Sequence, residues 1–236
     1  MAINVSGAIL SLANELAERY EAPIPLLEIA EEELIRVICD DYGAMTFDGL
    51  TWFEAETDEF FIHLNTNKLK GNYPKSVKGR FTLAHELGHY FIPYHRLGLM
   101  NGELKPHGSV NFLTNQGAWQ LERDADAFAS NLLMPTIYVK QLIKGRCFDF
   151  GLIEEIAETF QVSKSAAALR FADIGNTPIM VVYAIDGKIQ WVSRSEDFPF
   201  WRLRNGNGKG DRVPENTVMG TYFYEHDNSD CRQEET

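Results

Sequence analysis

The chain has 236 residues, of which 44% are hydrophobic, and it carries a formal net charge of −12. This length and hydrophobic content suffice for the core of one large domain, or of one domain with an appendage. Because the charge is strongly negative and no long run of Lys or Arg interrupts it, the composition disfavours direct binding to nucleic acid.

The cysteines and the N-terminal segment indicate in which cellular compartment the protein is expected. Cys39, Cys147 and Cys231 are odd in number, lie far apart and form no C-x-x-C pair. This pattern argues against a disulfide framework or a zinc ribbon and fits a reducing compartment. The N-terminal residues lack the basic and apolar regions of a signal peptide, and the sequence has no run of about 20 apolar residues. We therefore expect a cytoplasmic protein that does not enter a membrane; the sequence does not indicate its oligomeric state.

Apolar periodicity and turn residues predict helices and a small sheet at the start of the chain. Ile9 to Tyr20 shows the i, i+3, i+4 spacing of an amphipathic helix, with Ser6 as its N-cap. Pro23 and Pro25 separate this helix from the elements that follow. In chain order, these are a short helix at 29–33, strands at 34–39, 50–55 and 59–64, and a polar loop at 68–78.

A second series of elements follows the polar loop. A helix is predicted from about Gly79 to Ile92, where Pro93 ends it. Segment 93–117 is rich in Gly and Pro and is predicted to be a long irregular loop, a common place for functional residues. The remaining predictions are a helix at 118–134, two or three short helices in 136–173, a β-hairpin around Asp186-Gly187 and a disordered polar tail over the last dozen residues.

The helix after the polar loop contains the string H-E-x-x-H, formed by His85, Glu86 and His89. Residues four apart lie on one face of a helix, so both imidazoles can bind one metal ion. Glu86 can accept a proton from a water on that ion, and zinc lowers the pKa of such a water to about 7. The string therefore predicts the centre of a zinc peptidase.

The flanks of the motif argue against two histidines that merely pack in a helix. From Phe81 to Phe91 the sequence is apolar nearly all round the helix, which is typical of a buried helix. Two buried histidines and a buried glutamate without a ligand would carry a large desolvation cost. We therefore interpret the string as a metal site.

Two residues are candidates for the third protein ligand. His95 occupies the last position of the metzincin string H-E-x-x-H-x-x-G-x-x-H, but Ile92 stands at the glycine position. Pro93 breaks the helix there without supplying a positive φ. Glu122 lies on a downstream helix whose apolar continuation indicates an inward face. We favour Glu122 and keep His95 as the alternative.

Three further residues are candidates for supporting roles. Asp126 follows Glu122 by one helical turn on the same face, so it can orient a ligating histidine through the ring nitrogen that does not bind the metal. His107 in the predicted loop and Tyr90 beside the motif are candidates for substrate binding. His107 could instead stabilise the transition state or be a plain surface histidine.

These motifs together resemble a known family. FTLAHELGHYF followed by ERDADAFASNLLMP resembles the ImmA/IrrE family of metallo-endopeptidases, over residues 10–175 and most sharply over 79–135. At position 126 Asn is also common in that family, and either side chain can accept a histidine N–H. The segment after 176 does not resemble the sensor domain of longer members, so the resemblance does not imply allosteric sensing.

The resemblance implies a fold and a function. It implies an α+β, gluzincin-like zinc domain in which a small sheet lies beside two metal-bearing helices. His85, His89 and Glu122 would hold one Zn²⁺ ion, with Glu86 as the general base. Members are cytoplasmic and act on a helix-turn-helix repressor, which relieves transcriptional repression in mobile-element control or stress response. We therefore expect a zinc endopeptidase whose partner is a DNA-binding repressor.

The sequence divides into three expected parts: a zinc metallopeptidase domain at 1–145, helix-turn-helix-like helices at 146–175, and a β-rich C-terminal segment at 176–236. In the middle part only Lys164 and Arg170 are basic after the turn, whereas a DNA recognition helix carries basic and amide side chains. We therefore interpret this helix pair as packing on the protease core, with substrate docking or DNA contact as alternatives.

One alternative function stays open at this point. The protein could be a non-enzymatic regulator in which zinc is structural and which binds a partner or DNA. Structural zinc sites have four protein ligands and no open position. A fourth side chain such as His95 closing the site would favour this alternative.

Overall fold

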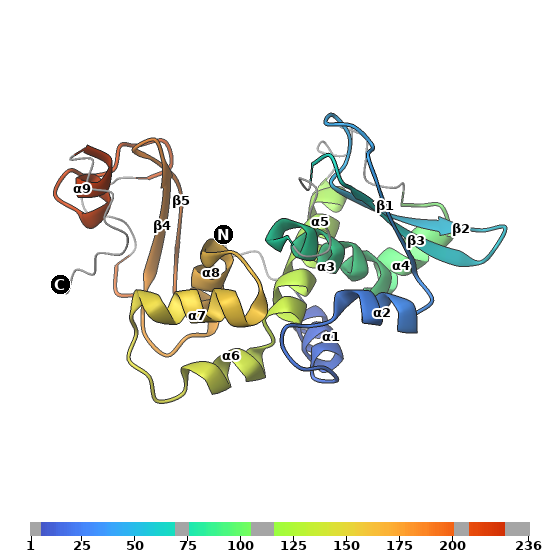
Figure 1. Cartoon of the computed structure of the whole chain (residues 1–236), viewed down its shortest axis with the longest axis horizontal. Helices are drawn as coiled ribbons and strands as arrows, with labels where there is room; N and C mark the ends of the chain where they lie inside the picture. Colours follow the sequence, from blue (N-terminus) through green and yellow to red (C-terminus); the bar gives the residue numbers. More distant parts are fainter. Residues whose placement is uncertain (1–5, 69–75, 105–115, 201–207, 225–236) are drawn as a thin grey trace. The chain divides into compact units, whose positions relative to one another are not determined.

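The structure, a computed structural model, describes residues 6–68, 76–104, 116–200 and 208–224 (Figure 1). His107 and the polar tail at 225–236, for which the sequence made predictions, lie outside the described residues. The chain divides into two compact units, one of residues 1–138 and 159–162, the other of 139–158 and 163–236. The described parts contain both helices and sheets, which confirms the predicted α+β class.

The first unit contains a three-stranded sheet in the order β1-β3-β2. Its strands are β1 (Arg36–Asp40), β2 (Gly49–Glu54) and β3 (Glu59–Asn65). β3 runs parallel to β1 and antiparallel to β2, and alternate residues of β3 are buried, as the period of two along a strand requires. The three predicted strands are thus confirmed, with small shifts at their ends.

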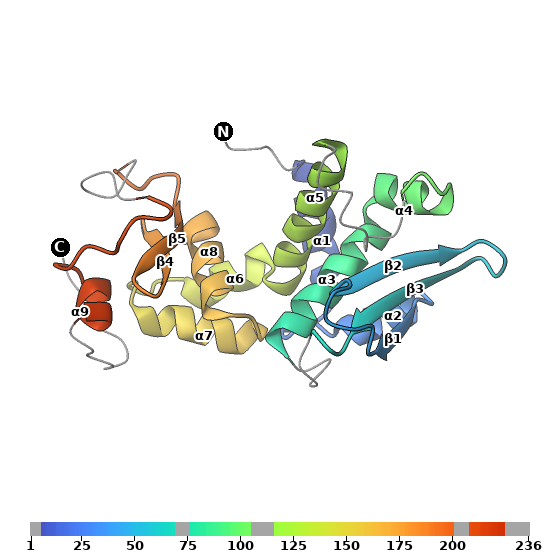
Figure 2. The same ribbon diagram turned by 90° about the horizontal axis from the view of Figure 1, so that it is seen from above.

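Helix α3 (Val77–Phe91), which carries the H-E-x-x-H string, packs against β2 and β3 and also against α5 (Gln116–Leu133). α5 in turn packs against α1 (Gly7–Ala17), while α2 (Leu26–Glu32) contacts α3 and β1. Figures 1 and 2 show α3 between the sheet and α5. α3 is therefore buried on most sides, as its apolar flanks predicted.

Gly88 lets α3 and α5 approach closely. A Cβ built on this residue would lie 3.2 Å from Phe128 Cδ1 and 3.3 Å from both Cα and O of Ala125. The two Ala125 atoms belong to the backbone of α5, so a rotamer change cannot move them away. Glycine at this position of the motif therefore sets how near the downstream helix can come.

Gly88→Ala is expected to lower the free energy of unfolding by about 1 kcal/mol, because overpacking costs about 1–3 kcal/mol and the better helix propensity of alanine returns up to about 1. Gly7→Ala is the matched control, since Gly7 begins α1 and a Cβ added there would have no heavy atom within 4 Å. Urea denaturation of both variants measures the difference. Equal stability of the two would show that Gly88 does not limit the approach of the helices.

One prediction about a segment without a regular pattern was wrong in part. Residues 93–100 were predicted to be irregular, but α4 (Pro93–Met100) is a helix that starts at Pro93. Proline fits the first position of a helix because its missing N–H has no partner there anyway, so Pro93 both ends α3 and starts α4. The C-terminal segment, predicted to be β-rich, also contains the short helix α9 (Val218–Tyr224).

The second unit holds the predicted hairpin and helix pair. β4 (Met180–Ile185) and β5 (Lys188–Arg194) pair antiparallel around Asp186 and Gly187, both with positive φ. α7 (Phe150–Phe160) and α8 (Lys164–Ile174) form the helix pair, and α8 packs on β4 and β5. α6 (Thr136–Ile143) precedes them and crosses the boundary between the units.

The two basic residues of α8 are engaged within the chain. The guanidinium of Arg170 is buried and donates to Asp173 Oδ2 at 2.8 Å. Lys164 Nζ donates to Glu154 Oε1 at 2.5 Å. Arg170 is therefore not presented for a phosphate contact, whereas the side chain of Lys164 is 61% exposed. None of the helices in the described ranges combines the length and the apolar composition that crossing a membrane requires.

Candidate metal centre

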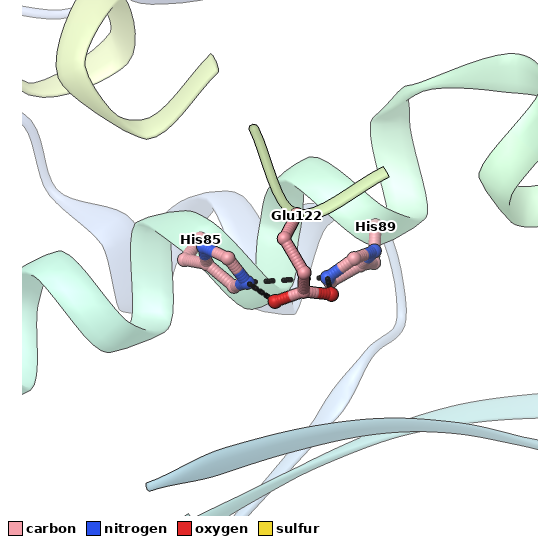
Figure 3. Close-up of side chains that lie close together, drawn as sticks. All are labelled: His85, His89 and Glu122. Carbon is pink, nitrogen blue, oxygen red and sulfur yellow. Dashed lines mark hydrogen bonds and ion pairs between the residues drawn. The ribbon is translucent and has the colours of Figure 1, made fainter. Parts of the chain in front are cut away.

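Three side chains from α3 and α5 converge on one point. His85 and His89 lie one turn apart on α3, and Glu122 reaches them from α5 (Figure 3). The two Nε2 atoms are 3.2 Å apart, and the Glu122 carboxylate lies 3.3 Å from Nε2 of His85 and 3.6 Å from Nε2 of His89. Their three ligand atoms all lie within 4.8 Å of one another.

This arrangement fits a bound metal ion. Two nitrogens bound tetrahedrally to one zinc ion at about 2.0–2.1 Å lie about 3.3 Å apart. The observed separation of 3.2 Å between the two Nε2 atoms is close to that value. Two neutral imidazoles and one carboxylate are also a donor set that divalent zinc accepts.

Each histidine is also held by the ring nitrogen that faces away from the cluster. Nδ1 of His85 donates to Asp126 Oδ1 at 2.8 Å, and Nδ1 of His89 lies 3.1 Å from Nδ1 of His95. Burial lowers the pKa of His85, but the hydrogen bonds to Asp126 and Glu122 outweigh it and raise that pKa to about 10. Asp126 thus contacts the ring nitrogen of His85 that faces away from the cluster.

His95 lies behind His89 as seen from the cluster. It is fully buried at the start of α4, and it meets the motif through the pair of Nδ1 atoms. Nδ1 and Nε2 lie on opposite sides of an imidazole ring, so His95 is placed away from the converging ligand atoms. Among the described residues, the candidate metal cluster consists of His85, His89 and Glu122.

Glu86 is buried between α3 and the sheet. It is 4% exposed, and Thr51 Oγ1 of β2 donates to its Oε2 at 2.7 Å. Burial raises the pKa of the Glu86 carboxyl, while the charge of His85 and the hydrogen bond from Thr51 act in the opposite direction. The carboxylate is thus fixed in place next to the two histidines.

A pocket of about 430 Å³ opens beside the cluster. Its wall includes residues of α3, of α5 and of the segment that leads into β2. They are Phe47, Asp48, Gly49, Lys78, Phe81, Thr82, His85, Glu86, Glu122 and Asp126. Because this wall includes Glu86 and two of the candidate metal ligands, His85 and Glu122, a molecule in the pocket lies next to the reactive groups.

Of the two candidates for substrate binding, only Tyr90 lies in the described residues. Tyr90 is buried, its hydroxyl donates to Glu33 Oε2 at 2.9 Å, and the guanidinium of Arg96 lies 4.3 Å from its ring centre. It does not belong to the wall of the pocket. These contacts link α3 to Glu33, the residue after α2, so Tyr90 has a packing role.

The sequence did not indicate two residues of β2, Gly49 and Thr51, as part of the site. Thr51 donates to the Glu86 carboxylate, and a Cβ added to Gly49 would lie 2.7 Å from Glu86 Oε1. Strand periodicity alone could have placed them on one face, but nothing in the sequence indicates that this face meets α3 at Glu86.

Comparisons with known proteins agree with the geometry. Residues 31–172, more than half of the chain, match the family model of the IrrE N-terminal-like domain, peptidase family M78. Metallopeptidase ImmA of Bacillus subtilis (strain 168) is 29% identical over 150 residues, which cover 63% of this chain and 76% of that protein. A solved Mycobacterium tuberculosis transcriptional regulator superposes with a TM-score of 0.51 at 16% identity, covering 84% of this chain and 58% of that one. At that identity the likeness concerns the fold alone.

Proposed function

The chain belongs to the IrrE N-terminal-like family of M78 peptidases, and from this premise we propose that it is a zinc-dependent endopeptidase. Its substrate would be a specific cytoplasmic protein, a helix-turn-helix transcriptional repressor, whose cleavage relieves repression. The observation that carries the proposal is the convergence of His85, His89 and Glu122 on one point beside the buried carboxylate of Glu86.

The proposed roles follow from the contacts. Nε2 of His85, Nε2 of His89 and the Glu122 carboxylate would hold the ion. A bound zinc ion would act as a Lewis acid, which lowers the pKa of a water molecule and polarises a peptide carbonyl. Glu86 accepts the proton of the water whose oxygen forms the new bond to the carbonyl carbon. Glu86 then returns that proton to the amine nitrogen as the C–N bond breaks.

The outer contacts keep both histidines in the tautomer that a ligand needs. For Nε2 to bind a metal, its lone pair must be free, so the ring proton sits on Nδ1. Asp126 accepts that proton from His85 at 2.8 Å. The Nδ1 atoms of His89 and His95 are 3.1 Å apart, so His95 can accept the proton of His89 when its own ring proton is on Nε2.

The substrate class rests on the family resemblance and on charge. A DNA-binding repressor exposes basic side chains that contact phosphates. This chain has a net charge of −12, and Glu122 and Asp126 line the pocket, where Asp48 is paired with Lys78 at 2.8 Å. Opposite charge speeds the encounter of two proteins and favours one relative orientation.

The alternative of a purely structural metal receives no support from His95. A structural zinc site is closed by four protein ligands. His95 meets the opposite ring nitrogen of His89, and the pocket gives access to the cluster at His85 and Glu122. An arrangement of three side chains with an accessible side is what a catalytic site requires.

Metal-dependent cleavage tests the proposal directly. The zinc-loaded protein is incubated with the helix-turn-helix regulator encoded beside it, and mass spectrometry maps any new termini. We expect one discrete cut, which disappears when a chelator removes the metal and returns when zinc is added back. Persistence of the cut in chelator-treated protein of verified metal content would contradict a metal-dependent reaction.

A further inference from the structure

Strand β2 touches the side chain of Glu86 at two of its residues. Thr51 is 1% exposed, and its Oγ1 lies 2.7 Å from Glu86 Oε2 and 3.0 Å from the Glu86 carbonyl oxygen. A Cβ added to Gly49 would lie 2.6 Å from Thr82 Cγ2, 2.7 Å from Glu86 Oε1 and 2.8 Å from Glu86 Cγ. Residues two apart lie on the same face of a strand, which is why both positions meet the same side chain.

The hydroxyl of Thr51 has a choice of two acceptors on Glu86. A hydroxyl carries one proton, so it donates to one acceptor at a time. The carboxylate oxygen is both the nearer acceptor and the charged one, and hydrogen bonds to charged groups are roughly twice as strong as neutral ones. Thr51 therefore donates mainly to Oε2, which fixes the rotation of the carboxylate.

Gly49 provides the space for the other carboxylate oxygen. Gly49 and Glu86 both line the pocket, and any side chain at position 49 would overlap Oε1. The carboxylate therefore lies between a donor at one oxygen and a glycine backbone at the other. Both constraints come from β2, and neither residue is part of the metal cluster.

We propose that Thr51 is a positioning residue for the general base: its hydroxyl holds Oε2 of Glu86 and thereby presents Oε1 to the pocket, in the space that Gly49 leaves. The inference rests on the proposed role of Glu86 as the proton acceptor. A catalytic group loses rate steeply when it is displaced, by about 100-fold for a shift of about 1 Å. A fixed carboxylate is therefore expected to contribute to kcat rather than to substrate affinity.

Cleavage kinetics form the first test, with the repressor cut by the wild-type protein as substrate. Thr51→Val keeps the shape of the side chain and removes the proton, so kcat is expected to fall about 10- to 100-fold, with KM and zinc affinity within about twofold. Thr51→Ser restores the donor and is expected to recover most of kcat. Thr57→Val, an exposed threonine in the turn between β2 and β3, is the matched control and should cleave like the wild type. An unchanged kcat in Thr51→Val would overturn the proposal.

A double-mutant cycle in the metal-free protein tests the contact without any cleavage. In the protein that retains Glu86, Thr51→Val is expected to lower the folded-to-unfolded equilibrium constant about 10-fold. In a Glu86→Ala background the same change is expected to cost less than about threefold, because the carboxylate acceptor is gone. An equal cost in both backgrounds would mean that the hydroxyl acts only through the backbone carbonyl, which overturns the proposal.

Gly49→Ala gives a second route if Thr51→Val does not fold. It leaves the hydroxyl of Thr51 in place, but its Cβ would meet both the carboxylate and Thr82 Cγ2, so it is expected to lower kcat about 10-fold or more while zinc binding persists. Wild-type kcat in Gly49→Ala would overturn the proposed positioning. Failure of the proposed function would give another result: the wild-type protein would cut no substrate. The double-mutant cycle would still measure the hydrogen bond between Thr51 and Glu86.

Discussion

Glu86→Gln is expected to lower kcat/KM for substrate cleavage about 10²- to 10⁴-fold while leaving the fold and the zinc content unchanged. The amide has nearly the same shape as the carboxylate, and its oxygen can still accept the hydrogen bond from Thr51. It is, however, far too weak a base to take a proton from water at neutral pH, and a positioned acid or base contributes a factor of this size. Cleavage assays combined with metal analysis by mass spectrometry measure both quantities.

The control for this change must remove a glutamate charge elsewhere in the same unit. Glu56 lies exposed in the turn between β2 and β3, so Glu56→Gln should cleave at the wild-type rate. Glu86→Gln is expected to lose activity but keep its zinc, whereas Glu56→Gln is expected to keep both. If Glu86→Gln cleaves as fast as wild type, Glu86 is not the general base, and the inference about Thr51 fails with it.

The candidate metal cluster could be proposed from the sequence because its residues follow helical periodicity. His85 and His89 are four residues apart, as are Glu122 and Asp126, and a helix puts each pair on one face. The structure brings Glu122 to both histidines and Asp126 to the outer nitrogen of His85. Apolar neighbours on both helices indicated that these faces point inward.

The contacts that cross between distant elements were not predictable in the same way. Thr51 is 35 positions from Glu86 in the chain, and their hydrogen bond depends on which face of β2 packs on α3. Strand periodicity yields two faces but does not say which element covers each of them. In the sequence, Asp48-Gly49 predicts only a turn. The structure shows that position 49 lies beside the Glu86 carboxylate.

The placement of His95 shows that a match to the metzincin spacing does not by itself bring a residue to the converging ligand atoms. The spacing matched a metzincin ligand, and the residue does lie next to the cluster. Because Pro93 starts the new helix α4 instead of a glycine turn, the imidazole arrives behind His89. Ile92 at the glycine position and Pro93 after it already disfavoured His95 as the third ligand in the sequence, although the helix that starts at Pro93 was not predicted.

Glu122→Gln is expected to weaken zinc binding more than 100-fold, and more than the change Asp126→Asn. An amide is a neutral and poor zinc ligand, so the variant loses one of three protein ligands and its charge. Asp126 only orients His85, and loss of such an outer partner typically costs about 10- to 100-fold in metal affinity. Competition titrations with a chromophoric chelator measure both dissociation constants.

Thermal unfolding provides an independent measure of the same ranking. A ligand that binds only the folded state at 100 times its Kd stabilises it by about 2.7 kcal/mol, so added zinc should raise the Tm of the wild-type protein clearly. The rise should be smaller in Asp126→Asn and nearly absent in Glu122→Gln. Glu158→Gln, an exposed glutamate of α7 in the other compact unit, controls for the loss of charge. If Asp126→Asn abolished the rise while Glu122→Gln retained it, Asp126 would be the ligand and the proposed roles of the two acids would be exchanged.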